Sequence, residues 1–154
     1  MYENLFKSPL HRVFLYGTLK RGEPNHGLIQ DATNGYAKLL GLGRTTVAYP
    51  LIIATKYNIP FLLKNNVFLV CFDHILSMLT FSSFYPSHLI LGTIVSSCID
   101  LQVGALTKVW IYFLPKFRRS LLDRMMYKSY ASTGSHGLKY CENDESSVRL
   151  EDLL

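Results

Sequence analysis

Charged residues are scarce in this chain, and one long stretch has none. Lys, Arg, Asp and Glu make up 18% of the 154 residues, whereas soluble domains carry about a quarter. None of the four occurs between Asp73 and Asp100, where several serines, Pro86 and His88 interrupt an apolar run. A membrane span needs about 20 mainly apolar residues, so the stretch 75–99 is long enough for one. A membrane tolerates such interruptions only where neighbouring groups satisfy the polar atoms, so we expect no span. A variant anchored in the membrane through 75–99 is the weaker alternative.

Cysteine is also rare. Cys71, Cys98 and Cys141 lie far apart and are odd in number, which fits neither a disulfide framework nor the spacing of a metal site. We therefore expect buried free thiols in a reducing compartment. The start of the chain contains Glu3 and no apolar core, so we do not expect a secretory signal. Together these absences predict a cytoplasmic protein without a bound metal.

The remaining bulk properties limit the partners and the organisation of the chain. The net charge is +5, but the basic residues are scattered and no nucleic-acid motif occurs, so no nucleic-acid partner is expected. A chain of 154 residues is large enough for one domain with a single core. We predict an N-terminal extension over 1–11, one domain over 12–141 and an acidic tail over 142–154.

The most informative stretch is an apolar run that ends at a glycine. Residues 13–16 have no polar face, which predicts a buried strand. Gly17 permits a turn or a close approach of a ligand to the backbone, and Thr18 and Leu19 follow in a tight loop. Several backbone N–H groups would then face an anionic or carbonyl ligand, before Lys20–Gly22 returns the chain to water. On the residues alone, an ordinary strand-to-turn transition is the commoner explanation.

Short apolar segments separated by glycine and proline turns make up most of the remaining chain. Strands are predicted at 37–46, with a bulge or bend near Gly41 and Gly43, and at 51–54, 59–63 and 109–113. One or two helical turns are predicted at 28–32 and at 117–123. This pattern indicates an α+β fold, a small curled sheet or barrel with a few helices packed outside.

Several of these segments resemble one known family. The string Tyr16–Gly22, followed by Pro24-Asn25-His26, is similar to the N-terminal signature of the gamma-glutamylcyclotransferase-like superfamily, in particular of the gamma-glutamylamine cyclotransferases. Further similar segments are 43–45, 49–54, 58–63, 129–130 and 134–140. The resemblance covers 12–63 well and 109–142 loosely, and it implies the small barrel with outer helices that the residues also predict.

The resemblance implies an activity on a small molecule. Such enzymes cyclise a gamma-glutamyl group, releasing 5-oxoproline and a free amine, and in the gamma-glutamylamine branch that amine is lysine from gamma-glutamyl-epsilon-lysine. No metal or organic cofactor is implied. Tyr16, Gly17, Thr18 and Leu19 would form the loop that holds the substrate, largely through main-chain groups. The simpler role for Tyr16 is that of a core aromatic whose hydroxyl is satisfied.

The acid–base residue of the family has no match here. The family places this glutamate after a Phe, in a helix that follows a Gly-Glu-Val-Tyr strand and an Asp. Val67–Val70 and Asp73 faintly resemble that strand and its Asp, but Phe81 is followed by Ser82. Asp73 is more simply a helix N-cap. We interpret 64–106 as an atypical segment that replaces the catalytic region of the family.

The catalytic residues are therefore unassigned. No glutamate occurs between Glu23 and Glu142, and removing a general acid–base group commonly costs a factor of about 10²–10⁴ in rate. Histidine also titrates near neutral pH, and the candidates are His26, His74 and His136, with structural roles expected for the first and the last. Two hypotheses follow: a gamma-glutamylamine cyclotransferase, or a non-catalytic pseudo-enzyme, as in a variant isoform, that binds gamma-glutamyl compounds.

Overall fold

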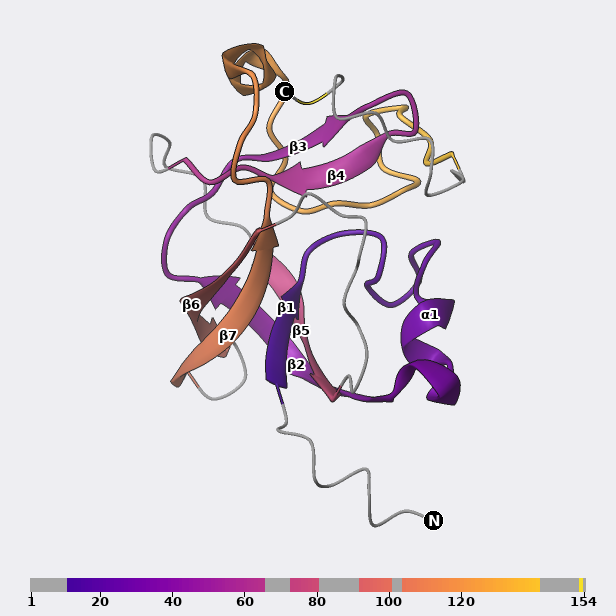
Figure 1. Ribbon diagram of the computed structural model, residues 1–154, viewed down its shortest axis with the longest axis vertical. Helices are drawn as coiled ribbons and strands as arrows, with labels where there is room; N and C mark the ends of the chain where they lie inside the picture. Colours follow the sequence, from indigo (N-terminus) through magenta and orange to yellow (C-terminus); the bar gives the residue numbers. More distant parts are fainter. Residues whose placement is uncertain (1–10, 66–72, 81–91, 101–103, 142–152, 154) are drawn as a thin grey trace.

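The strands of a small closed barrel form the larger part of the fold. The computed structural model describes residues 11–65, 73–80, 92–100, 104–141 and 153. The barrel strands in this part are β1 His11–Leu15, β2 Tyr36–Thr45, β5 Asp73–Thr80, β6 Gly92–Asp100 and β7 Leu106–Phe113. Their order around the barrel is β1, β5, β2, β6, β7 (Figure 1). Neighbours pair antiparallel except β1 and β7, which close the barrel through the parallel pair Val13–Trp110.

Two further strands form a separate hairpin at one end of the barrel. β3 Leu51–Ala54 and β4 Ile59–Leu62 pair antiparallel and lie above the barrel in Figure 1. Both were predicted from their apolar residues, and both are almost entirely buried. The hairpin is joined to the end of β7 because the Leu114 N–H donates to the Leu62 carbonyl over 2.8 Å.

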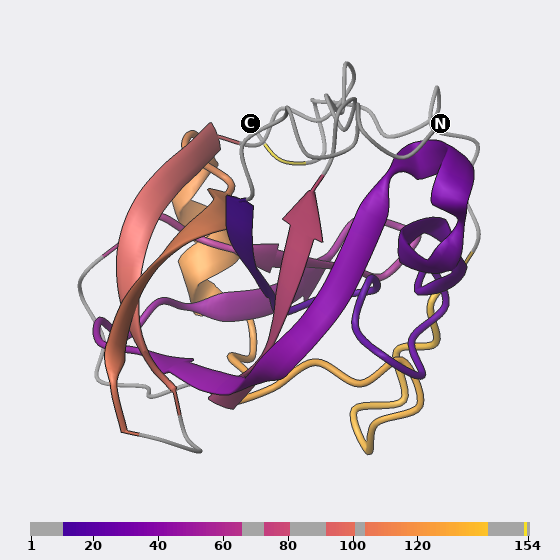
Figure 2. The ribbon, with the colours of Figure 1, turned by 90° about the horizontal axis from the view of Figure 1, so that it is seen from below.

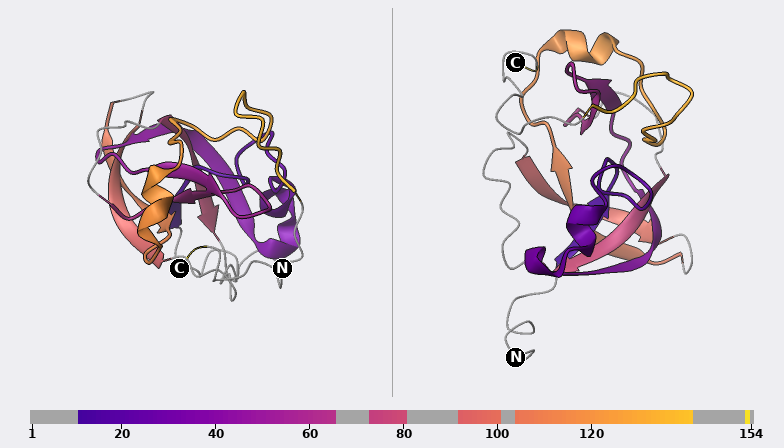
Figure 3. Two further views of the ribbon diagram at one scale, coloured as in Figure 1. Left: turned by 90° about the horizontal axis from the view of Figure 1, so that it is seen from above. Right: turned by 90° about the vertical axis from the view of Figure 1, so that its right-hand side faces the viewer.

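Helical turns in the described residues are short. They are α1 Gly27–Gln30, the 3₁₀ turn η1 Ala32–Asn34 and the 3₁₀ turn η2 Arg119–Asp123. The predicted helix at 28–32 is thus interrupted at Asp31, whose carboxylate accepts a 2.9 Å hydrogen bond from the Thr33 N–H and starts η1. Figure 3 shows α1 outside the barrel, which agrees with the predicted arrangement of sheet and outer helices.

The charge-free stretch contributes strands to the barrel. Residues 73–80 and 92–100 are β5 and β6, and 81–91 lies outside the described residues. Among the helices that the structure describes, none is long and apolar enough to cross a membrane. Asp73 is the first residue of β5 and pairs in register with Arg44, so its predicted role as a helix N-cap is wrong. The predicted irregularity of β2 is confirmed by a register shift between Leu39 and Gly41.

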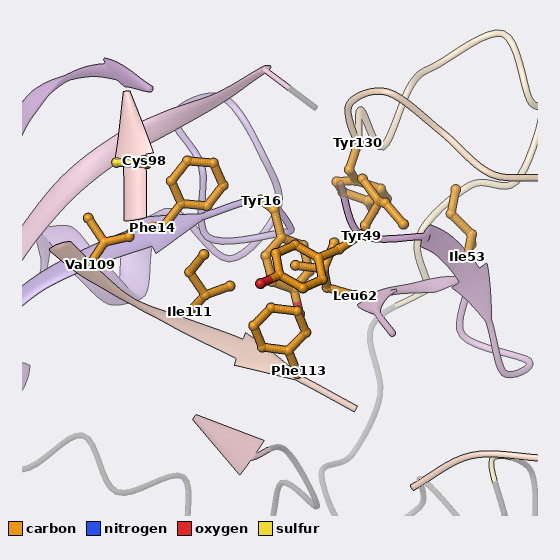
Figure 4. Packing of buried hydrophobic residues seen from close by; sticks show 11 residues of the cluster. Phe14, Tyr16, Tyr49, Ile53, Leu62, Cys98, Val109, Ile111, Phe113 and Tyr130 are labelled. Carbon is orange, nitrogen blue, oxygen red and sulfur yellow. The ribbon is translucent and has the colours of Figure 1, made fainter. Parts of the chain in front are cut away.

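Apolar side chains fill the space between the barrel and the hairpin. The strands curve round a common interior when seen from below (Figure 2). The main cluster combines residues of β1, β3, β4, β6 and β7 with residues from the loops, and Figure 4 shows its packing. Its buried members are Phe14, Tyr16, Tyr49, Leu51, Ile53, Leu62, Cys98, Val109, Ile111, Phe113 and Tyr130. Packing therefore links the end of β1 directly to the hairpin.

The replacement Phe14→Ala tests this core. The Phe14 side chain is fully buried, and removing a buried phenylalanine ring costs about 3–5 kcal/mol because a cavity remains. We expect urea unfolding to show a loss of that size. Leu106→Ala on β7 is the control, since Leu106 is 71% exposed and its loss should stay near 0.5 kcal/mol or less, about the usual limit for surface sites. Equal losses at the two positions would contradict the described core.

Candidate functional site

The loop that follows β1 folds back on itself. We call residues 16–26 the Gly17 loop. The Lys20 N–H donates to the Gly17 carbonyl over 3.1 Å, and the Asn25 N–H donates to the Thr18 carbonyl over 3.0 Å. A Cβ atom on Gly17 would lie 3.0 Å from Cγ of Pro60 in β4. Gly17 is therefore required for the close contact between this loop and the hairpin.

Three backbone donors near the start of the Gly17 loop are not used by the described part of the chain. Within the described part of the chain, the N–H groups of Gly17, Thr18 and Leu19 have no hydrogen-bond acceptor. The carbonyls of Thr18 and Leu19 are in contrast used: the latter accepts from Nδ1 of His26 over 3.0 Å. The carbonyls of residues 17–19 thus help to hold the loop, while the N–H groups of the same three residues can serve a ligand that offers oxygen atoms.

The side chain of Tyr16 belongs to the core. It is buried, and burial raises the pKa of its phenol above the ordinary value, with a smaller contribution from nearby Tyr112. A hydrogen bond from the backbone of Leu62 acts in the opposite direction. The hydroxyl of Tyr16 is therefore satisfied within the fold, as expected for a core aromatic residue.

Lys20 does not return the chain to water as predicted. Its side chain is buried, and Nζ donates to the main-chain carbonyl of Tyr130 and, over 3.3 Å, to Oγ of Ser129. Burial lowers the pKa of the Lys20 ammonium, and the nearby Glu23 carboxylate opposes this shift. Glu23 in turn accepts a 2.9 Å hydrogen bond from the Ser132 N–H. Both charged groups therefore attach the Gly17 loop to a distant part of the chain.

Residues 129–141, which we call the closing segment, lie against the Gly17 loop (Figure 3). A third link is formed by Asn25, whose Nδ2 donates to the Tyr140 hydroxyl over 3.2 Å and to Thr18 Oγ1 over 3.1 Å. The family-like segments 129–130 and 134–140 were apparent in the sequence, but these links were not. The signal was present in the two matched segments, yet nothing in the sequence indicated that they meet the loop.

The two histidines of this region have structural roles, as predicted. Nδ1 of His26 must carry the proton, because it bonds the carbonyl of Leu19. In His136, Nε2 donates to the Ala131 carbonyl over 2.8 Å, and Nδ1 accepts from the Leu138 N–H over 2.9 Å. These hydrogen bonds engage one ring nitrogen of His26 and both ring nitrogens of His136 in holding the fold.

Other predicted residues are only partly placed. Val67–Val70, Phe81 and Ser82 lie outside the described residues, as does Cys71. Cys98 is a buried free thiol, as predicted, but the free thiol of Cys141 is exposed. Cys141 is the last residue of the closing segment and lies at the surface, where its N–H donates to the carbonyl of Tyr57.

Comparison with known proteins decides the family. Residues 13–70, which contain β1, the Gly17 loop and the hairpin, match the family described as gamma-glutamyl cyclotransferase, AIG2-like. The chain is 32% identical to gamma-glutamylaminecyclotransferase C of Danio rerio, over 87% of this chain and 95% of that protein. The chain belongs to this family.

Other relatives agree over most of their length. The chain is 35% identical to a Drosophila melanogaster protein that carries the name gamma-glutamylcyclotransferase, over 93% of each chain. The crystal structure of an AIG2-like protein from Mus musculus superposes with a TM-score of 0.80 at 28% identity, over 88% of this chain and 97% of that chain. The predicted α+β barrel with outer helices is thus confirmed.

Gly17→Ala tests the contact between the loop and the hairpin. The added Cβ would press on Pro60, and overpacking of this kind costs about 1–3 kcal/mol. We expect urea unfolding to show a loss near 1 kcal/mol. Gly27→Ala is the matched control, because nothing lies within 4 Å of the added Cβ and alanine favours α1. Equal stability of the two variants would contradict the close contact.

Alkaline pH should destabilise the protein through Tyr16. The pKa of this phenol is raised in the folded state from 10.0. Above about pH 10 the unfolded chain loses the proton that the folded protein keeps, so stability falls with a limiting slope of about 1.4 kcal/mol per pH unit. Tyr16→Phe removes this contribution. Its free energy of unfolding should decline less steeply than that of the wild type in urea titrations above about pH 10, and parallel slopes would refute the assignment.

Proposed function

We propose that the protein binds gamma-glutamyl amines at the Gly17 loop and converts them into 5-oxoproline and a free amine. Gamma-glutamyl-epsilon-lysine is the proposed substrate, with lysine as the released amine. The observation that carries this proposal is a set of donors in the segment that matches the family: among the described residues, the N–H groups of Gly17, Thr18 and Leu19 find no acceptor. Donors fixed in one loop suit the oxygen atoms of a glutamyl group. A cytoplasmic location is part of the proposal, in line with the free thiols of Cys98 and Cys141.

The reaction is an intramolecular acyl transfer. The alpha-amine of the substrate attacks its own gamma-carbonyl carbon, a new C–N bond closes the five-membered ring, and the bond to the departing amine breaks. The protein must hold the substrate in a folded shape, which makes the attack a proximity effect. Backbone N–H groups that point at the carbonyl oxygen stabilise the charge that develops there. The loop can supply both the hold on the folded substrate and the N–H donors, because its own carbonyls are already bonded and hold it in place.

The proton has to move from the attacking ammonium to the departing amine. In the family that the sequence resembles, a glutamate is expected to carry this proton, and this chain has no matching residue. That 64–106 replaces the catalytic region of the family remains our prediction. Glu23 is the carboxylate within the Gly17 loop, but it is bonded to the Ser132 N–H. The absence of any glutamate between Glu23 and Glu142 favours a second candidate function. In that case the protein binds gamma-glutamyl compounds without converting them.

One experiment separates these functions. The purified protein is incubated with gamma-glutamyl-epsilon-lysine, and 5-oxoproline and lysine are followed by mass spectrometry. Alpha-glutamyl-lysine serves as the control substrate, because its amide is not at the gamma-carbonyl and cannot close the same ring. We expect equal amounts of 5-oxoproline and lysine from the first compound only.

Calorimetry with the same compounds completes the test. Saturable binding of gamma-glutamyl-epsilon-lysine without product would establish the non-catalytic binder. If the protein shows no heat of binding and forms no product, both candidate functions are overturned.

A further inference from the structure

One buried polar atom is left without a partner in the described structure. The side chain of Tyr130 is 1% exposed, and its hydroxyl has no hydrogen-bond partner among the described residues. A buried polar group without a partner commonly costs about 1–3 kcal/mol. Such an atom calls for an explanation, and a ligand that supplies the missing partner is one of the few available.

The position of Tyr130 connects this atom with the Gly17 loop. Its main-chain carbonyl accepts from Nζ of Lys20, so a residue of the loop fixes the start of the closing segment at this tyrosine. The Tyr130 ring packs in the same cluster as Tyr16, Tyr49 and Leu62, where the barrel meets the hairpin (Figure 4). The end of β1 and the Tyr130 side chain thus belong to one buried cluster.

Two groups that act on the Tyr130 phenol are linked to the loop. The pKa of the Tyr130 phenol is raised by burial, and further by the Glu23 carboxylate and by Tyr140. Glu23 is a loop residue, and the hydroxyl of Tyr140 accepts from Asn25, another loop residue. Groups that act on the Tyr130 hydroxyl therefore belong to the Gly17 loop or are bonded to it.

We propose that the Tyr130 hydroxyl is a substrate-binding donor, which bonds an oxygen of the gamma-glutamyl group held at the Gly17 loop, and that Lys20 is its positioning residue. This inference rests on the proposed function and extends the site from backbone donors to one side chain. A phenol that keeps its proton is a neutral donor, and it suits a carboxylate or a carbonyl oxygen. The Lys20 ammonium is occupied by Tyr130 and Ser129, so it acts on the ligand through the tyrosine.

Tyr130→Phe separates binding from stability. The replacement keeps the ring and removes only the unpaired hydroxyl, so the thermal midpoint of the free protein should stay unchanged or rise. The affinity for 5-oxoproline, which carries both a carboxylate and a carbonyl, should fall about tenfold or more, as for the loss of a hydrogen bond to a charged group. Calorimetry measures the affinity, and differential scanning calorimetry measures the midpoint.

Tyr127→Phe is the matched control. Tyr127 precedes the closing segment, and its half-buried ring packs edge-on against His136 at a centroid distance of 5.3 Å. Its affinity for 5-oxoproline should equal that of the wild type. A Tyr130→Phe protein that loses stability but binds normally would show that Tyr130 has a structural role. This outcome would overturn the present inference but not the proposed function. Failure of the wild type to bind 5-oxoproline or gamma-glutamyl-epsilon-lysine would overturn the proposed function and this inference with it.

A double-mutant cycle tests the part played by Lys20. If Lys20 acts through Tyr130, Lys20→Met should weaken 5-oxoproline binding in the wild type but add little to the loss in Tyr130→Phe. Additive losses would mean that Lys20 acts on the ligand or the loop independently, which would remove its assignment as the positioning residue.

Discussion

A buried ammonium group organises the region around the Gly17 loop. Lys20 and its acceptor Tyr130 are 110 residues apart in sequence, yet they meet in the interior of the fold. A charge that is taken out of water must find partners, because the desolvation cost is otherwise several kcal/mol. Lys20 finds them in the closing segment, so the loop cannot move away from that segment without exposing an unpaired group. The links of Glu23 to Ser132 and of Asn25 to Tyr140 reinforce the same contact.

The backbone donors and acceptors of residues 17–19 differ in their use. The carbonyls of Gly17, Thr18 and Leu19 accept from groups of the same loop, and this fixes the shape of the turn. Their N–H groups have no acceptor in the described part of the chain. The shape of such a turn depends on backbone geometry more than on the identity of its side chains. A segment as short as Tyr16–Gly22 can therefore carry much of the resemblance to the family.

Local apolar pattern was sufficient to predict much of the barrel. β3 was predicted with its observed bounds, and β4 differs by one residue, because short apolar segments between turn residues have few other uses. The stretch 75–99 was ambiguous, since a barrel strand buried within a charge-free run resembles a membrane span in composition. The burial of Lys20 was missed because a lysine next to an arginine and a glycine usually faces water. Its acceptor, the Tyr130 carbonyl, lies 110 residues away in the sequence. Sequence pattern does not show which distant residues come together in space.

The closure of the barrel has a consequence for biosynthesis. β1 is synthesised before its parallel neighbour β7 and before the closing segment, because both follow it in the sequence. Contacts of such high sequence separation form slowly, because a long chain must be ordered before they can stabilise it. Until β7 and the closing segment are made, β1 lacks its parallel neighbour and the Gly17 loop lacks the contacts that hold it. The segment that matches the family is thus complete well before the residues that fix it in place.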